Sequence, residues 1–71
     1  METEDTEIRF GVIAVKRGFT SPQQIVNALE IQVKENLSTG KHRRIGEILL
    51  DQGILSQLQM EKVVKELDQI R

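Results

Sequence analysis

The sequence predicts an all-α fold of two αα-hairpins, four short helices in all, related by a pseudo-two-fold axis. The first observation is an internal repeat, because a shift of 35 residues lays the Arg-Phe-Gly of residues 9–11 over the Arg-Ile-Gly of residues 44–46. The second is that each copy continues with a glycine that can end a helix and a Ser-x-x-Gln sequence that can begin one. Two copies are too few for a solenoid, so we expect the halves to pack face to face.

The repeat rests on identities in register and on apolar residues that match apolar residues. Phe10 corresponds to Ile45, for example, and Leu29 corresponds to Val64. Similar composition alone does not place the glycines at matching positions. The identical pairs are Arg9/Arg44, Gly11/Gly46, Ile13/Ile48, Gly18/Gly53, Ser21/Ser56 and Gln24/Gln59.

The first copy contains the first two predicted helices. Residues 1–7 are expected to form a disordered acidic tail, and a helix should run from about residue 7 to residue 17 and end at Gly18. Ser21 is a suitable N-cap for the next helix, with Pro22 at its first position and Gln24 closing a capping box. Apolar residues at spacings of three and four then predict a helix to about Asn36.

The second copy contains the other two helices. Residues 38–43 lack periodicity and form the predicted loop between the copies. A third helix should span residues 44–52, and a fourth should span residues 57–70. Strand is the alternative for residues 10–15 and 48–50, because Val and Ile are only moderate helix formers. Ile45, Ile48 and Leu49 of the third helix and Met60, Val63, Val64 and Leu67 of the fourth are expected to be buried.

Composition limits the class of protein. At 71 residues the chain forms one domain, here assigned to residues 8–71, with copy one at 9–32 and copy two at 44–67. It has no cysteine, no apolar run that could span a bilayer and an acidic N-terminus, so we expect a cytoplasmic protein without membrane insertion. Residues 8–71 carry 10 basic and 7 acidic groups, a balance of +3 that favours a small anion over a long polyanion.

No pattern of catalytic residues is present, so we expect a non-enzymatic protein without metal or cofactor. His42 has no second histidine or carboxylate pair nearby in the sequence, and a solvated loop residue is its simpler interpretation. Gly40-Lys41 does not begin a phosphate-binding P-loop, because position 35 is Glu and position 42 is His. DNA binding is disfavoured, since Glu61, Glu66 and Asp68 balance the lysines of the fourth helix.

The repeated glycines and arginines each allow two interpretations. Gly11 and Gly46 can let two helices approach closely, or they can bring backbone N–H groups near a helix N-terminus to a phosphate. Arg9 and Arg44 can be solvated surface residues, or they can bind a phosphate or a guanine edge with two hydrogen bonds.

The doubled Arg-Φ-Gly-x-x-Φ-Φ-x-x-Gly pattern, where Φ is apolar, resembles the MshEN family, the N-terminal domain of MshE-type ATPases of type II secretion and type IV pilus systems. The resemblance covers about residues 8–67 and includes no ATPase part. It implies a module that binds cyclic-di-GMP between the two motif copies and relays this to a partner protein, such as a secretion or pilus component. The residues that would contact the dinucleotide are Arg9, Phe10, Gly11, Ile25, Leu29, Gln32, Arg44, Ile45, Gly46, Met60 and Val64.

A ligand-independent adaptor of the same fold is the alternative function. In that case the Arg-Φ-Gly copies are structural and the module docks a partner protein; pairing of the copies across a homodimer is also compatible with the sequence. The positions of Arg9 and Arg44 discriminate between the two functions. Arginines that converge on one groove favour the cyclic dinucleotide, and arginines that point apart favour the adaptor.

Overall fold

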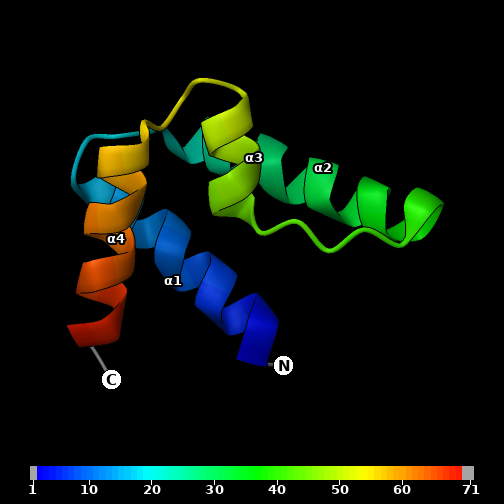
Figure 1. Ribbon diagram of the computed structural model, residues 1–71, viewed down its shortest axis with the longest axis horizontal. Helices are drawn as coiled ribbons and strands as arrows, with labels where there is room; N and C mark the ends of the chain where they lie inside the picture. Colours follow the sequence, from blue (N-terminus) through cyan, green and yellow to red (C-terminus); the bar gives the residue numbers. More distant parts are fainter. Residues whose placement is uncertain (1, 70–71) are drawn as a thin grey trace.

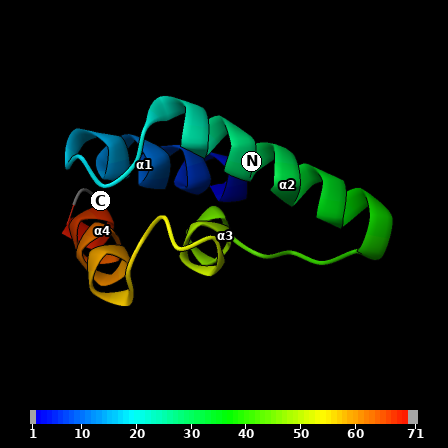
Figure 2. The same ribbon diagram turned by 90° about the horizontal axis from the view of Figure 1, so that it is seen from above.

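The computed structural model describes the backbone of residues 2–69 and the side chains of residues 6–69. It contains four helices, α1 (Glu2–Lys16), α2 (Pro22–Thr39), α3 (Ile45–Asp51) and α4 (Gln57–Gln69), and no strand within this part of the chain (Figure 1). The predicted all-α fold is therefore confirmed, and the strand alternative is wrong. In Figure 2, α1 and α2 form one layer and α3 and α4 form the other.

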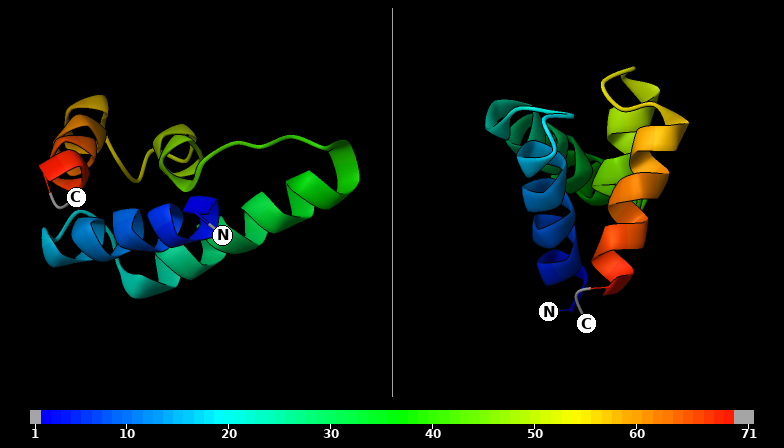
Figure 3. Two further views of the ribbon diagram at one scale, coloured as in Figure 1. Left: turned by 90° about the horizontal axis from the view of Figure 1, so that it is seen from below. Right: turned by 90° about the vertical axis from the view of Figure 1, so that its left-hand side faces the viewer.

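The two hairpins pack face to face. α1 packs against α4, and α2 packs against α3, which crosses it; these contacts are more extensive than those between the helices of one hairpin (Figure 3). The α1–α4 contact and the α2–α3 contact are therefore the two that join the hairpins most extensively.

The turns inside the two hairpins have the same local conformation. Gly18 and Gly53 both have φ of 77°, in the left-handed region that favours glycine. Each glycine N–H donates to a carbonyl three residues earlier, and the next N–H donates to a carbonyl five residues earlier, as in a Schellman motif. The glycines therefore end α1 and α3 as predicted, with α3 extending to Asp51 and Gln52 as its C-cap.

Both predicted capping boxes are present. The Ser21 hydroxyl accepts from the Gln24 N–H at 3.2 Å, and the Gln24 side chain accepts from the Ser21 N–H at 2.9 Å. Ser56 and Gln59 repeat this pair of bonds at 3.1 and 2.9 Å. Local sequence therefore determines where α2 and α4 begin. The expected last residue of the fourth helix, Ile70, lies outside the described residues.

The first helix begins earlier than expected. α1 starts at Glu2, so residues 2–7, expected as a tail, are helical. Acidic residues suit the first turn of a helix because they face the positive end of the helix dipole. Glu7 itself is buried, with 3% of its surface exposed. Its assignment to a solvated tail was wrong.

The second helix ends later than expected. α2 continues past Asn36 to Thr39, and Gly40, with φ of 74°, ends it. The Ser38 and Thr39 hydroxyls donate to the carbonyls of Lys34 and Glu35, four residues earlier. The Gly40 N–H donates to the Asn36 carbonyl, one of the acceptors left open at the helix end. The last two turns of α2 extend beyond the other helices, and residues 40–44 return beside them to α3 (Figures 1 and 2).

The core lies between the two layers and comes from all four helices. Ile45, Ile48 and Leu49 of α3 are buried as predicted, and Val63 is the predicted α4 residue with no exposed surface. Val64 was expected inside but is 44% exposed. The short α3 supplies a large share of the core because three of its seven residues are buried aliphatics. The buried apolar residues are Phe10, Ile13, Ala14, Ile25, Ala28, Ile45, Ile48, Leu49, Leu55 and Val63.

Both motif glycines lie at close helix contacts. A Cβ atom on Gly11 would lie 2.8 Å from Cγ2 of Ile25, and one on Gly46 would lie 2.9 Å from Cζ of Phe10. Gly11 is in the middle of α1, so its N–H is not at a helix N-terminus, whereas Gly46 is the second residue of α3. The close-approach interpretation therefore accounts for both glycines.

We predict that Gly11→Ala destabilises the protein although alanine is the better helix former by about 1 kcal/mol. The new methyl group meets the branched Cγ2 of the buried Ile25, and overpacking of this kind costs about 1–3 kcal/mol. Urea denaturation measures the difference. Adding Ile25→Leu, which removes the Cγ2 branch, should recover part of the loss. An unchanged or higher midpoint for Gly11→Ala would show that this contact is not tight.

Candidate functional site

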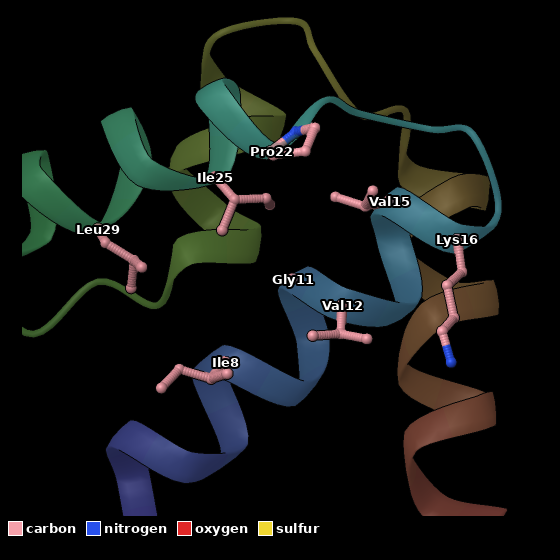
Figure 4. A pocket seen from close by; sticks show the side chains of 8 residues that line it. All are labelled: Ile8, Gly11, Val12, Val15, Lys16, Pro22, Ile25 and Leu29. Carbon is pink, nitrogen blue, oxygen red and sulfur yellow. The ribbon is translucent and has the colours of Figure 1, made fainter.

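An open apolar groove of about 310 Å³ separates α1 from α2 on the outer face of their layer (Figure 4). α1 contributes Ile8, Val12 and Val15 to its walls, and these side chains follow one face of the helix at spacings of three and four residues. Ile8 and Val12 are 56% and 48% exposed. Apolar side chains therefore lie on two faces of α1. One face is packed in the core, and the other is exposed to solvent.

Three residues predicted to contact a dinucleotide line this groove. Gly11, Ile25 and Leu29 all belong to copy one, and Pro22 completes the α2 wall. Lys16 stands at the end of α1 and is the one charged residue of the lining. Arg9 precedes Lys16 by seven residues, or two helical turns, and therefore lies on the same side of α1. The groove thus combines an aliphatic surface with positive charge along its α1 side.

Another group of predicted residues meets at the buried carboxylate of Glu7. Oε1 of Glu7 accepts from Nε2 of Gln32 at 2.6 Å and from the backbone N–H of Ile45 at 2.9 Å. Oε2 of Glu7 lies 4.0 Å from Nη1 of Arg44. The Gln32 amide also donates to the carbonyl of Arg43 at 3.0 Å. Gln32 and Arg44, predicted to contact a ligand, here contact a carboxylate of the same chain.

The two motif arginines do not converge on the groove. The Arg44 guanidinium lies at Glu7, and Arg9 follows Glu7 by two residues on α1. Two residues correspond to about 200° around a helix, so Arg9 projects from the opposite side of α1. The Arg44 side chain is 62% exposed and does not line the groove. One cleft shared by both arginines is therefore not formed within this chain.

The remaining predicted residues belong mainly to the packing of copy two. Phe10 and Ile45 are core residues, with 6% and no exposed surface. Gly46 is buried where the Phe10 ring and Sδ of Met60 approach it. Val64 is exposed on α4 and lies outside the groove lining. Of the predicted copy-two residues, Ile45 and Gly46 are therefore packed inside and Val64 is exposed, and none of them lines the groove of copy one.

Arg43, in the segment of residues 40–44 that connects α2 to α3, forms ion pairs with both of these helices. Arg43 donates from Nε to Oε1 of Glu35 at 3.0 Å, and its Nη atoms contact Glu35 and Asp51. These hydrogen bonds hold the pKa of Glu35 below its ordinary value and raise the pKa of Arg43. Nδ1 of His42 lies 2.8 Å from Nδ2 of Asn36. His42 and Arg43 therefore hold residues 40–44 against α2 and α3.

Sequence reasoning missed Glu7, Ile8 and Val12 as parts of these sites. Glu7 precedes Phe10, Gly11 and Ala14 by three, four and seven residues, the spacing of one helix face. That spacing was the available signal, and the acidic residues before Glu7 obscured it by suggesting a tail.

Neither a metal site nor a membrane span is found in the described part of the chain. Among residues 2–69, no three His, Cys, Asp or Glu side chains are grouped in a way that could hold a metal ion. No helix within the same range has the length and apolar character needed to cross a membrane. Comparison with models of protein families, with curated proteins and with solved structures finds no match to this chain.

We predict that Glu7→Ala lowers the free energy of unfolding by about 1–3 kcal/mol, because it leaves the Gln32 amide and the Ile45 N–H without their acceptor. Glu7→Gln should cost less, since an amide oxygen can still accept from Ile45. Chemical denaturation gives the stabilities, and hydrogen exchange at the Ile45 amide reports the local bond. Asp68→Ala, at an exposed position of α4, is the control. Equal effects of Glu7→Ala and Asp68→Ala would contradict a structural role for the Glu7 carboxylate.

Proposed function

We propose that this chain is a small non-enzymatic protein-interaction module that docks a partner through the groove between α1 and α2. The observation that carries the proposal is the groove itself, whose lining is aliphatic apart from Gly11 and Lys16 and whose α1 wall exposes Ile8 and Val12. Exposed apolar surface of this kind marks interaction sites in soluble domains. The separation of Arg9 from Arg44 also favours an adaptor over a ligand clamp formed by both arginines.

The shape and charge of the groove define the partner's chemistry. A groove between two walls of aliphatic side chains suits the apolar face of an amphipathic helix. Lys16 lines the groove and Arg9 lies on the same side of α1, so a helix with acidic residues along that flank is favoured. The resemblance to MshEN domains makes a secretion or pilus component one candidate for this partner.

We expect an amphipathic helical peptide with an acidic flank to bind this groove more tightly than the same peptide with a basic flank. NMR titration of the labelled chain should show shifts at Ile8, Val12, Val15 and Leu29. Val12→Glu places a carboxylate in the wall and should abolish these shifts, whereas Leu58→Glu, at an exposed leucine on α4, should preserve them. Shifts confined to α4, or equal binding of both peptides, would contradict the proposed surface.

Cyclic-di-GMP is the second candidate occupant, and one observation favours it. Gly11, Ile25 and Leu29 of the predicted contact set share the groove with Lys16, and Arg9 lies on the same side of α1. A guanine face can lie on the aliphatic side chains while the lysine and the arginine attract a phosphate. In this arrangement copy one alone binds the ligand, since the copy-two residues lie outside the groove.

Under the nucleotide proposal, calorimetry should detect cyclic-di-GMP binding with a Kd of about 10 µM or tighter near 150 mM salt. Arg9→Ala should weaken binding, while Arg44→Ala should leave it unchanged because Arg44 does not line the groove. GTP serves as the control ligand. Absence of heat from the folded chain would rule out this candidate, and equal losses in the two variants would indicate a site formed by both copies.

A further inference from the structure

An apolar stripe runs along the exposed side of α2. It consists of Val26, Leu29, Val33 and Leu37, which we call the α2 stripe. At 100° per residue these four positions lie within about 80° of one another around the helix. Val26 and Val33 are each 55% exposed and Leu37 is 82% exposed. Its second half lies on the part of α2 that extends beyond the other helices (Figures 1 and 2).

We propose that a second copy of this chain covers the α2 stripe, by antiparallel pairing of two α2 helices about a two-fold axis level with residue 32. In this pairing a residue n lies level with residue 64 − n of the other copy. Val33 of one copy is then level with residue 31 of the other, between that copy's Leu29 and Val33. Leu37 similarly lies level with residue 27, between Val26 and Leu29 of the other copy. The two stripes therefore interdigitate along the whole contact, as packed helices require.

Charge along the stripe selects this direction and register. Glu30 and Lys34 are exposed and lie on the same flank of α2, about 40° and 80° from Val26 around the helix. Because 30 and 34 add up to 64, the antiparallel pairing sets Glu30 of each copy opposite Lys34 of the other. A parallel two-fold pairing places this flank of the two helices on opposite sides of the contact, so these Glu30–Lys34 pairs do not form. Exposed pairs contribute little affinity, but here they favour the antiparallel arrangement.

The extent of the contact is compatible with a weak, closed dimer. α2 has 18 residues and is therefore about 27 Å long. Contact between two helices of this length is near the lower limit of about 1,000 Å² for specific interfaces. A two-fold pairing uses the same surface on both copies, so it ends at two chains. Leu29 also lines the groove, whereas Val26, Val33 and Leu37 lie outside it. Dimerisation of the chain alone does not rest on the proposed docking of a partner.

Sedimentation velocity tests the dimer, and charge reversal tests its register. The wild-type chain should form dimers that dissociate on dilution. Glu30→Lys and Lys34→Glu should each weaken self-association by about tenfold, because two attractive pairs become repulsive. A mixture of these two variants should recover dimers, since every opposed pair is again attractive. Glu61→Lys and Lys65→Glu, at exposed α4 positions with the same spacing, are matched controls that should leave the dimer unchanged.

The apolar contact has its own control. Leu37→Glu should give a folded monomer, because Leu37 contributes almost nothing to the core, and Leu58→Glu should remain dimeric. A wild-type chain that stays monomeric at about 1 mM would overturn the proposal. Dimers that survive Leu37→Glu, or single charge variants that associate as strongly as the wild type, would overturn it as well. Circular dichroism of every variant verifies that a lost dimer is not a lost fold.

Discussion

The arrangement of the two hairpins depends on one buried carboxylate. Glu7 on α1 receives hydrogen bonds from Gln32 on α2 and from the first N–H of α3, so three helices meet at one side chain. An apolar core holds helices together without fixing their rotation, because its interactions have little directionality. Hydrogen bonds to a buried acceptor are directional, and breaking them is costly. Glu7 therefore sets where α3 begins relative to the first hairpin.

Local signals made the helix ends near the hairpin turns predictable. Gly18 and Gly53 end helices, and Ser21 and Ser56 begin them, through bonds between residues at most five apart in sequence. Such bonds form largely independently of the rest of the fold. The extension of α2 to Thr39 also rests on local bonds, but hydroxyl side chains more often stop helices than continue them. For that reason the sequence favoured an earlier end.

The candidate site was less predictable because it depends on contacts across the repeat. Phe10 and Ile45 occupy equivalent positions in the two copies of the repeat. The Phe10 ring nevertheless lies against Gly46 of copy two. Gln32 has Leu67 as its equivalent, so the bonds that Gln32 makes to Glu7 and Arg43 have no counterpart in copy two. Matching turns in the two copies therefore coexist with unlike surfaces. No periodicity within one copy could reveal these contacts with the other copy.

The extended end of α2 gives the molecule an uneven distribution of stability. Residues 33–39 lack buried side chains, and ion pairs of Arg43 with Glu35 and Asp51 fasten the returning segment beside them. Segments held mainly by exposed polar contacts open at lower free energy than a packed core. This end of the helix can therefore unwind and re-form while both hairpins stay folded. Raised ionic strength, which screens those ion pairs, should make the opening more frequent without altering the core.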